Sequence, residues 1–141
     1  MNIAHFLMPK CNSAYLFEDY SLRQGLEKMK YHGYSAIPVI SREGKYIGTI
    51  SEGDFLWFLL LENEDEIIHI DIRDIENKFI RDILNRDKYK PVSIMSPLDD
   101  VFEMAMSQNF VPVVDDRGYF MGIITRQTIM KYFFQNKNRE K

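Results

Sequence analysis

Residues 37–54 read IPVISREGKYIGTISEGD, and residues 111–128 read VPVVDDRGYFMGIITRQT. At this one fixed offset the two stretches agree in a proline, two glycines and a hydroxyl residue, which are Pro38, Gly44, Gly48 and Ser51 in the first and Pro112, Gly118, Gly122 and Thr125 in the second. No gap is needed from Pro38 through Leu60. Agreement of these residue types at fixed spacing indicates that the chain contains an internal duplication.

Each copy predicts the same order of elements: a short strand, a helix, a strand, a tight turn, a strand and a helix. The short leading strands are expected at Ala14–Phe17 and Lys90–Ile94, and the tight turns at 42–44 and 116–118, where charged residues end in a glycine. The predicted fold class is therefore mixed α/β (α+β), built from two β-α-β-β-α repeats.

Residue types that start and stop helices flank the first helix of each copy. In the second copy Ser96 is expected to cap the helix N-terminus, with Pro97 at the first helical position. Gly33 and Asn109 lie where a helix often ends on a residue in the left-handed conformation. These residues set the expected limits of the two helices.

A copy of about 50 residues with a small sheet cannot bury both faces of that sheet alone. We therefore expect the two copies to pack against each other as a pseudo-two-fold pair. The expected divisions are residues 1–61 for the first repeat, 62–87 for a linker or helical connection, and 88–141 for the second repeat. The acidic start of the connection, ENEDE at 62–66, is interpreted as a solvated helix end.

Composition argues against several classes of protein. The 141 residues carry a net charge of −3, whereas a nucleic-acid-binding protein usually has a basic surface. The longest strongly apolar run, Phe55–Leu61, is far shorter than the roughly 20 residues that a membrane span needs. The first residues show no signal-peptide pattern, and the single cysteine, Cys11, has no partner for an internal disulfide. We therefore expect a cytoplasmic protein with no nucleic-acid or membrane partner.

Patterns for catalysis and metal binding are weak throughout the sequence. His5, His32 and His69 lie far apart, and no paired cysteines accompany them, so no metal site is expected. Cys11 lies beside Lys10 in an expected N-terminal loop, with no identifiable base to activate it. Neither the glycine-rich phosphate loop nor the dinucleotide fingerprint is present. We expect no enzymatic activity and no cofactor.

The duplicated pattern resembles the CBS domain family, of which two copies in tandem form a Bateman module. The resemblance lies in a strand with Ile/Val-Pro-Val, then Gly-apolar-apolar-Ser/Thr-x-x-Asp, then an apolar helix, and it covers about Phe6 to Phe134. The stretches at 34–39 and 122–126 are similar to those of small stand-alone CBS-pair proteins of Gram-positive bacteria, some of which bind cyclic di-AMP or linear adenine nucleotides. This resemblance implies a module with no attached enzyme that holds its ligand in a cleft between the repeats.

The candidate site in the first copy is GTISEGD at 48–54, where a strand leads directly into a helix. Free backbone N–H groups and the positive end of the helix dipole gather at such a helix N-terminus and favour an anion such as phosphate. The resemblance implies that Ser51 contacts phosphate and that Asp54 accepts hydrogen bonds from ribose hydroxyls. The alternative is structural, because Ser51 is a good N-cap and Asp54 at the third helical position completes a capping box.

The second copy reads GIITRQT at 122–128, where Thr128 replaces the acidic residue. The usual ribose contact is therefore not expected there. Arg126 opposes the helix dipole, so local stability does not favour it, whereas a bound phosphate would reverse that sign. We interpret Thr125 and Arg126 as phosphate ligands, with an exposed surface arginine as the alternative, and we expect the two copies to bind unequally.

An adenine ring requires a flat, apolar slot rimmed by backbone groups. The resemblance places this slot at the first short strand and the start of the second strand of each copy. The implied residues are Ala14, Tyr15, Tyr34, Ser35, Ala36 and Ile37 in the first copy and Val92, Ser93, Phe110 and Val111 in the second. Tyr34 could stack on the ring, whereas core packing is the alternative for Ile37 and Val111. Pro38 and Pro112 are expected to stop further strand pairing and leave the cleft open.

Two functions of different classes remain open. One is a sensor that binds cyclic di-AMP, AMP, ADP or ATP and signals to an unidentified partner protein. The other is a ligand-free, dimeric protein-interaction module with vestigial clefts. CBS pairs commonly dimerise through apolar helices, so a homodimer is expected in either case, with dimer-facing aromatic residues at Trp57, Phe58, Phe133 and Phe134.

Overall fold

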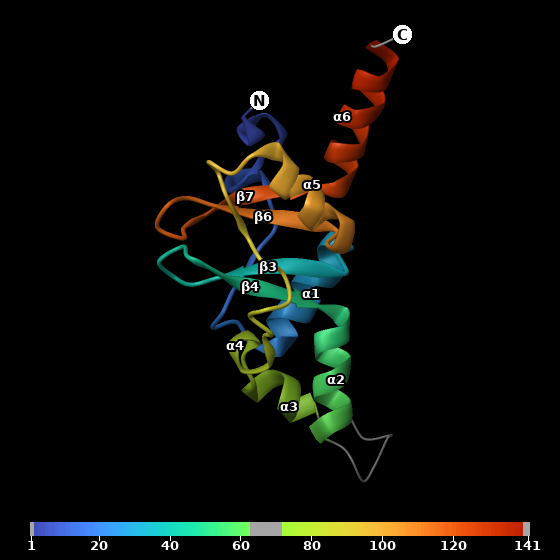
Figure 1. Cartoon of the computed structure of the whole chain (residues 1–141). Helices are drawn as coiled ribbons and strands as arrows, with labels where there is room; N and C mark the ends of the chain where they lie inside the picture. The colour runs from blue at the N-terminus through green and yellow to red at the C-terminus, as the bar shows by residue number, and fades with distance from the viewer. Residues whose placement is uncertain (1, 63–71, 140–141) are drawn as a thin grey trace. The chain divides into compact units, whose positions relative to one another are not determined.

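The computed structural model describes residues 2–62 and 72–139. The strands form two sheets, one with the order β2-β3-β4 and one with the order β1-β7-β6-β5. Figure 1 shows β3 beside β4 and β6 beside β7. The chain divides into two compact units, Ala14–Lys88 and Met1–Ser13 with Tyr89–Lys141. We call them the first-repeat unit and the second-repeat unit and describe each by itself.

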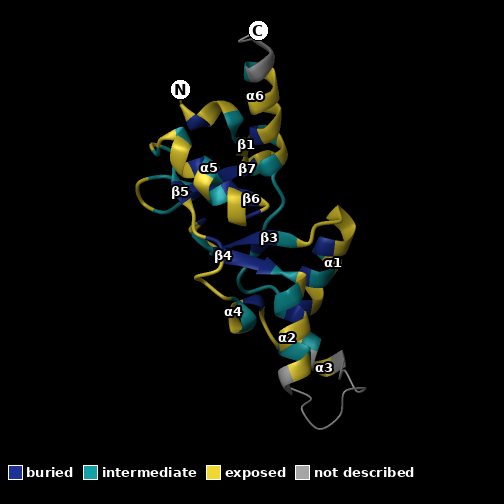
Figure 2. Cartoon of the chain, turned by 45° about the vertical axis from the view of Figure 1, so that its right-hand side comes forward, coloured by how far each residue is buried: buried dark blue, intermediate teal, exposed yellow. Residues whose placement is uncertain are grey.

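The first-repeat unit follows the predicted order of elements. It contains β2 (Leu16–Phe17), α1 (Leu22–His32), β3 (Ala36–Ile40), β4 (Tyr46–Ser51), α2 (Glu52–Glu62), α3 (Ile72–Asn77) and α4 (Ile80–Ile83). β2 pairs with β3 in parallel, and β3 pairs with β4 in antiparallel fashion. Burial is concentrated on β3 and β4, as Figure 2 shows in dark blue. The core cluster consists of Leu16, Leu22, Met29, Ile37, Val39, Ile50, Phe55 and Ile80.

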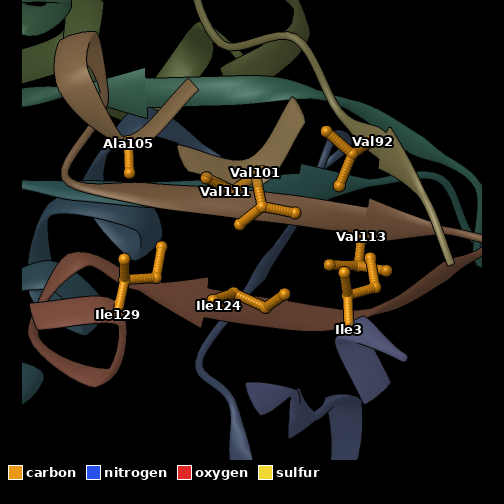
Figure 3. Packing of buried hydrophobic residues seen from close by; sticks show 8 residues of the cluster. All are labelled: Ile3, Val92, Val101, Ala105, Val111, Val113, Ile124 and Ile129. Atoms are coloured by element: carbon orange, nitrogen blue, oxygen red, sulfur yellow. The ribbon is translucent and has the colours of Figure 1, made fainter. Parts of the chain in front are cut away.

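The second-repeat unit repeats this order and adds an N-terminal segment. It contains η1 (Ile3–Phe6), β1 (Met8–Pro9), η2 (Lys10–Asn12), β5 (Val92–Ser93), α5 (Leu98–Ser107), β6 (Phe110–Val114), β7 (Phe120–Thr125) and α6 (Arg126–Arg139). Figure 3 shows its core, formed by Ile3, Val92, Val101, Ala105, Val111, Val113, Ile124 and Ile129. The mixed α/β fold class with duplicated β-α-β-β-α order is therefore confirmed, although both leading strands are shorter than expected.

The predicted turns and one predicted helix end are confirmed. Gly44 and Gly118 have φ values of 100° and 86°, which a residue with a side chain rarely adopts. Each closes its hairpin turn by donating its N–H to a carbonyl three residues earlier, at 2.9 Å and 3.1 Å respectively. Gly33 ends α1 in the left-handed conformation, with φ of 72° and ψ of 27°.

Two expectations about the limits of α5 are wrong. The N-cap is Pro97, not Ser96, because Pro97 is extended (ψ 155°) and α5 begins at Leu98. The N–H of Ser96 instead closes a turn onto the carbonyl of Ser93. The helix also ends on an extended residue, Gln108, so Asn109 is no left-handed stop. The buried side chain of Gln108 stabilises this exit by donating from Nε2 to the carbonyl of Phe110 at 3.2 Å.

Pro38 and Pro112 stop strand pairing on one side, as predicted. β2 pairs with β3 only from Val39 onward, and β5 pairs with β6 only from Val113 onward. A proline has no N–H to donate to a neighbouring strand, so the parallel pairing ends beside it. The antiparallel pairing of β3 with β4, on the opposite edge of β3, is not interrupted, and Pro38 lies opposite Thr49 there.

The segment before each repeat packs in the unit of the other repeat. Residues 2–13 pack in the second-repeat unit, where β1 pairs with β7, whereas residues 72–88 pack in the first-repeat unit. The duplicated glycines make room for them: a Cβ on Gly48 would lie 3.3 Å from Leu84, and a Cβ on Gly122 would overlap the carbonyl oxygen of Met8. Each glycine thus accepts the segment that leads into the other repeat. The limits proposed for the repeats themselves stay a prediction, and residues 63–71 of the connection lie outside the described residues.

None of the helices, as far as they are described, combines the length and the apolar character that crossing a membrane requires.

The contact between Gly122 and β1 predicts a large stability difference between two glycine variants. Gly122→Ala forces a side chain into the backbone of β1 at φ 149°, and we expect it to lower the free energy of unfolding by about 3 kcal/mol. Gly118→Ala is the control, because its positive φ lies in open space and a loss of about 1 kcal/mol is expected from the backbone alone. Urea unfolding measures both, and equal losses would show that β1 yields to the added carbon.

Candidate functional site

The junction between β4 and α2 brings four of the predicted residues together. Ala36 pairs with Ser51 at the end of the β3–β4 ladder. The next residue, Glu52, begins α2 and donates its N–H to the carbonyl of Ser35 at 3.0 Å. Asp54 lies in the first turn of the helix. The register of the ladder therefore gathers Ser35, Ala36, Ser51 and Asp54 around one helix N-terminus.

Asp54 and Ser51 are bonded to each other. Asp54 Oδ2 accepts from the backbone N–H of Ser51 at 2.8 Å and from its hydroxyl at 3.1 Å. The first of these bonds is one half of the capping box, which is expected if Ser51 and Asp54 serve to cap the helix. The side chain of Asp54 is only 13% exposed, and these two bonds hold its carboxylate against Ser51.

Lys88 completes this group, and sequence reasoning missed it. Its Nζ lies 2.6 Å from Ser51 Oγ and 3.4 Å from Asp54 Oδ1. In the sequence Lys88 stands between two other cations, Arg86 and Lys90, at the start of the predicted second repeat. No local pattern distinguishes Lys88 from these neighbours as the residue that contacts Ser51 and Asp54.

The aromatic candidates of the first-repeat unit lie in two different environments. Tyr15 packs edge-on against Phe17 at 5.7 Å, and Lys28 Nζ lies 5.3 Å from the centre of the Tyr15 ring. Burial lowers the pKa of Lys28, because an apolar surrounding disfavours its charged form. Tyr34 is 43% exposed and stacks on His32 at 5.5 Å with an interplanar angle of 11°. One face of the Tyr34 ring is therefore already covered.

Two further candidates of this unit differ in burial. Ala14 is half-buried at the edge of the core, whereas the side chain of Ile37 is fully buried within it. The side chain of Ile37 therefore packs in the core, which was the alternative to a role in binding.

The junction between β7 and α6 has the same backbone arrangement with different side chains. Arg126 begins α6 and donates its N–H to the carbonyl of Asn109 at 3.0 Å, as Glu52 does in the first copy. Thr125 Oγ1 accepts from the N–H of Thr128 at 3.2 Å, and the two threonine hydroxyls are 2.8 Å apart. This arrangement is a helix N-cap in which no carboxylate takes part.

The side chain of Arg126 has a structural partner. Its Nε donates to the carbonyl oxygen of Ala105 at 2.9 Å, near the end of α5, and the residue is half-buried. Carbonyls in the last turn of a helix lack partners within the helix, and a cation there is favourable. Arg126 is therefore not the exposed surface arginine of the alternative interpretation, whereas its role as a phosphate ligand stays a prediction.

The adenine candidates of the second copy are mostly buried. Val92 and Val111 belong to the core, and Phe110 is 7% exposed and lies 5.1 Å from the ring of Tyr89. Ser93 Oγ accepts from the N–H of Met95 at 3.1 Å. A pocket of about 390 Å³ reaches Val92 and Ser93, but its lining includes the carboxylates of Asp100 and Glu103, which repel a phosphate.

Other kinds of site find little support in the described part of the chain. Within residues 2–62 and 72–139 no three His, Cys, Asp or Glu side chains are placed to share a metal ion. His69 lies outside these ranges. Cys11 is exposed in η2 and has a free thiol.

Comparisons with known proteins agree with this architecture. The sequence model of the CBS domain matches residues 6–61 and 80–135. The uncharacterized protein MJ1426 of Methanocaldococcus jannaschii is 26% identical over 140 residues, which cover 82% of this chain and 83% of that protein. CbpB in complex with c-di-AMP is similar with a TM-score of 0.85 and 24% identity, covering 100% of this chain and 91% of that one. CBSX2 in complex with AMP has a TM-score of 0.74 and 24% identity, covering 96% and 98%. Both structures share the fold of this chain.

The bond from Arg126 to Ala105 predicts a stability effect without any ligand. We expect Arg126→Met to lower the free energy of unfolding by about 1 kcal/mol, because a half-buried helix carbonyl loses its charged donor. Gln127→Met, at the exposed neighbouring position, is the control and is expected to change the stability little. Thermal or urea unfolding of the nucleotide-free protein checks this, and equal stability of the two variants would contradict it.

Proposed function

The chain belongs to the CBS domain family, and from this premise we propose that it is a non-catalytic, cytoplasmic regulatory module that binds an adenine nucleotide. The single observation that carries the proposal is the group formed by Ser51, Asp54 and Lys88 at the N-terminus of α2. It combines a carboxylate, a hydroxyl and an ammonium at a helix N-terminus, where the positive end of the helix dipole lies. A carboxylate can accept from ribose hydroxyls, and an ammonium beside a helix N-terminus favours a phosphate.

Each member of this group has a role in the proposed complex. Asp54 accepts hydrogen bonds from ribose hydroxyls, since Oδ1 is contacted only by Lys88 among the described residues, at 3.4 Å. Ser51 and the N–H groups of the first turn of α2 lie beside the phosphate. Ala36, opposite Ser51, leaves space for the base, and the free face of Tyr34 is available for stacking.

The ligand class proposed is an adenosine phosphate, either cyclic di-AMP or one of AMP, ADP and ATP. Two structural neighbours are named as complexes with c-di-AMP and AMP, and their likeness to this chain is one of fold. The choice between the ligands rests on Asp54, which fits a ribose with free 2′ and 3′ hydroxyls. A cyclic dinucleotide has its 3′ oxygen esterified and would leave one acceptor position of the carboxylate unused.

The two repeats are proposed to bind unequally. The second junction has Thr128 in place of the carboxylate, and the Nε of its cation, Arg126, is bonded to Ala105. We therefore assign the principal site to the first repeat. Binding there is proposed to change the affinity of the module for an unidentified partner protein, which requires two states with different ligand affinity.

A homodimer is also proposed, and it is the basis of the second candidate function, a ligand-free interaction module. The observation that favours it is the exposure of large apolar side chains on two helices. On α2 these are Leu56, Trp57 and Leu60, and on α6 they are Met130, Phe133 and Phe134, each at least 43% exposed. Clusters of exposed apolar residues mark contact surfaces in soluble proteins.

Calorimetry with AMP, ATP, cyclic di-AMP and S-adenosylmethionine tests the nucleotide proposal. We expect at least one adenosine phosphate to bind with a dissociation constant below about 100 µM, which corresponds to a binding free energy of about −5.5 kcal/mol. Asp54→Ala is expected to weaken that binding about tenfold or more, because hydrogen bonds to a charged group are lost. Asp116→Ala, in the exposed hairpin turn, is the matched control and should leave the affinity unchanged.

Absence of binding by every nucleotide would refute the sensor proposal and favour the interaction module. If Asp54→Ala binds like the natural protein, Asp54 serves only to cap the helix.

Sedimentation velocity tests the proposed dimer. We expect the natural chain to sediment as a dimer, and Trp57→Ser with Phe133→Ser to shift it toward the monomer because apolar contact area is lost. Met106→Ser, at an 85% exposed position of α5, is the control. A monomeric natural chain, or a double variant that remains dimeric, would contradict this assignment of the contact surface.

A further inference from the structure

Lys88 is held at the β4–α2 junction by the packing of the segment before it. Leu84 and Arg86 lie against β4, where a Cβ on Gly48 would come within 3.3 Å of Leu84 and 3.4 Å of Arg86 Cα. A turn follows, in which Asn85 Oδ1 accepts from the N–H of Asp87 at 3.0 Å and the N–H of Lys88 points to the carbonyl of Asn85 at 3.5 Å. The position of Lys88 therefore depends on this turn as well as on its ion pair.

The ammonium of Lys88 reduces the negative charge at the first turn of α2. Glu52 and Asp54 both lie in that turn. Two carboxylates beside a helix N-terminus repel a phosphate at short range and offset the attraction of the helix dipole. The ammonium of Lys88 lies 3.4 Å from Asp54 Oδ1 and neutralises the partly buried carboxylate, leaving only that of exposed Glu52. A phosphate can then approach Ser51.

The ammonium also has a free donor for such a phosphate. It carries three N–H groups. Ser51 Oγ and Asp54 Oδ1 take two of them, and no described residue takes the third. The side chain is 37% exposed, so a ligand reaches the third N–H without breaking either existing contact.

We propose that Lys88 is the specificity-determining residue of the first-repeat site and that it selects ligands carrying a phosphate beside Ser51. This inference rests on the proposed function. It goes further by assigning the discrimination between an adenosine phosphate and an uncharged nucleoside to one ammonium. S-adenosylmethionine, which carries a cationic sulfonium and no phosphate, is rejected by the same group.

The test compares AMP with adenosine by calorimetry, with adenosine also measured by competition. Lys88→Met keeps the aliphatic stem and removes the charge, and we expect it to weaken AMP about tenfold while adenosine changes less than about twofold. Lys88→Arg is expected to restore most of the AMP affinity. Lys90→Met, which removes an exposed cation two positions along the chain, is the matched control and should change neither affinity.

A second measurement distinguishes the loss of the Lys88 charge from a general disturbance of folding in the Lys88→Met variant. The AMP affinity of the natural chain is expected to fall as salt is raised from 50 to 300 mM, and that of Lys88→Met to fall less, because a screened charge contact is absent. Cyclic di-AMP replaces AMP in the same series if it is the tighter ligand.

Three results would overturn the inference. In the first, Lys88→Met weakens AMP and adenosine equally, which assigns Lys88 to supporting the site. In the second, Lys88→Met binds AMP as well as or better than the natural chain, so that Lys88 contributes nothing or obstructs the site. In the third, the natural chain binds neither AMP nor cyclic di-AMP, which refutes the proposed function itself and is seen before any variant is made.

Discussion

The antiparallel pairing of β3 with β4, repeated by β6 with β7, is the interaction on which the rest of the structure depends. Its register places Ala36 opposite Ser51 and ends where α2 begins. Side chains alternate between the two faces of a strand, so a slip of one residue would turn Ile37 and Ile50 out of the core. The same slip would separate Ser35 from the start of α2. Core and candidate site are thus set by one ladder.

The duplication conserves the backbone of the two junctions and leaves their side chains free to differ. Glu52 and Arg126 occupy equivalent first positions of a helix, and each donates its N–H to a carbonyl just before the paired strand. Beyond that shared bond the chemistry differs. The first junction holds a carboxylate and an ammonium, whereas the second holds a pair of hydroxyls, Thr125 and Thr128, with the arginine turned to α5.

Two equivalent glycines allow each repeat to pack against the segment that precedes the other repeat. Gly48 and Gly122 are equivalent in the two repeats, and each leaves room for a segment from elsewhere in the chain. At Gly122 that segment is β1, which adds a strand at the edge of the sheet. At Gly48 it is the turn that carries Lys88. The absence of a side chain at these two positions therefore leaves each repeat room for such a segment.

The sequence by itself determined the local features of this protein. The order of elements, the turns at Gly44 and Gly118 and the helix stop at Gly33 all depend on hydrogen bonds between residues a few positions apart, and residue type encodes these. It also made Ser51 and Asp54 candidate site residues, since strand and helix meet there. Only the tertiary structure decided that Lys88 joins them and that Arg126 binds Ala105. Those contacts link residues distant in sequence, and the packing of whole segments sets them.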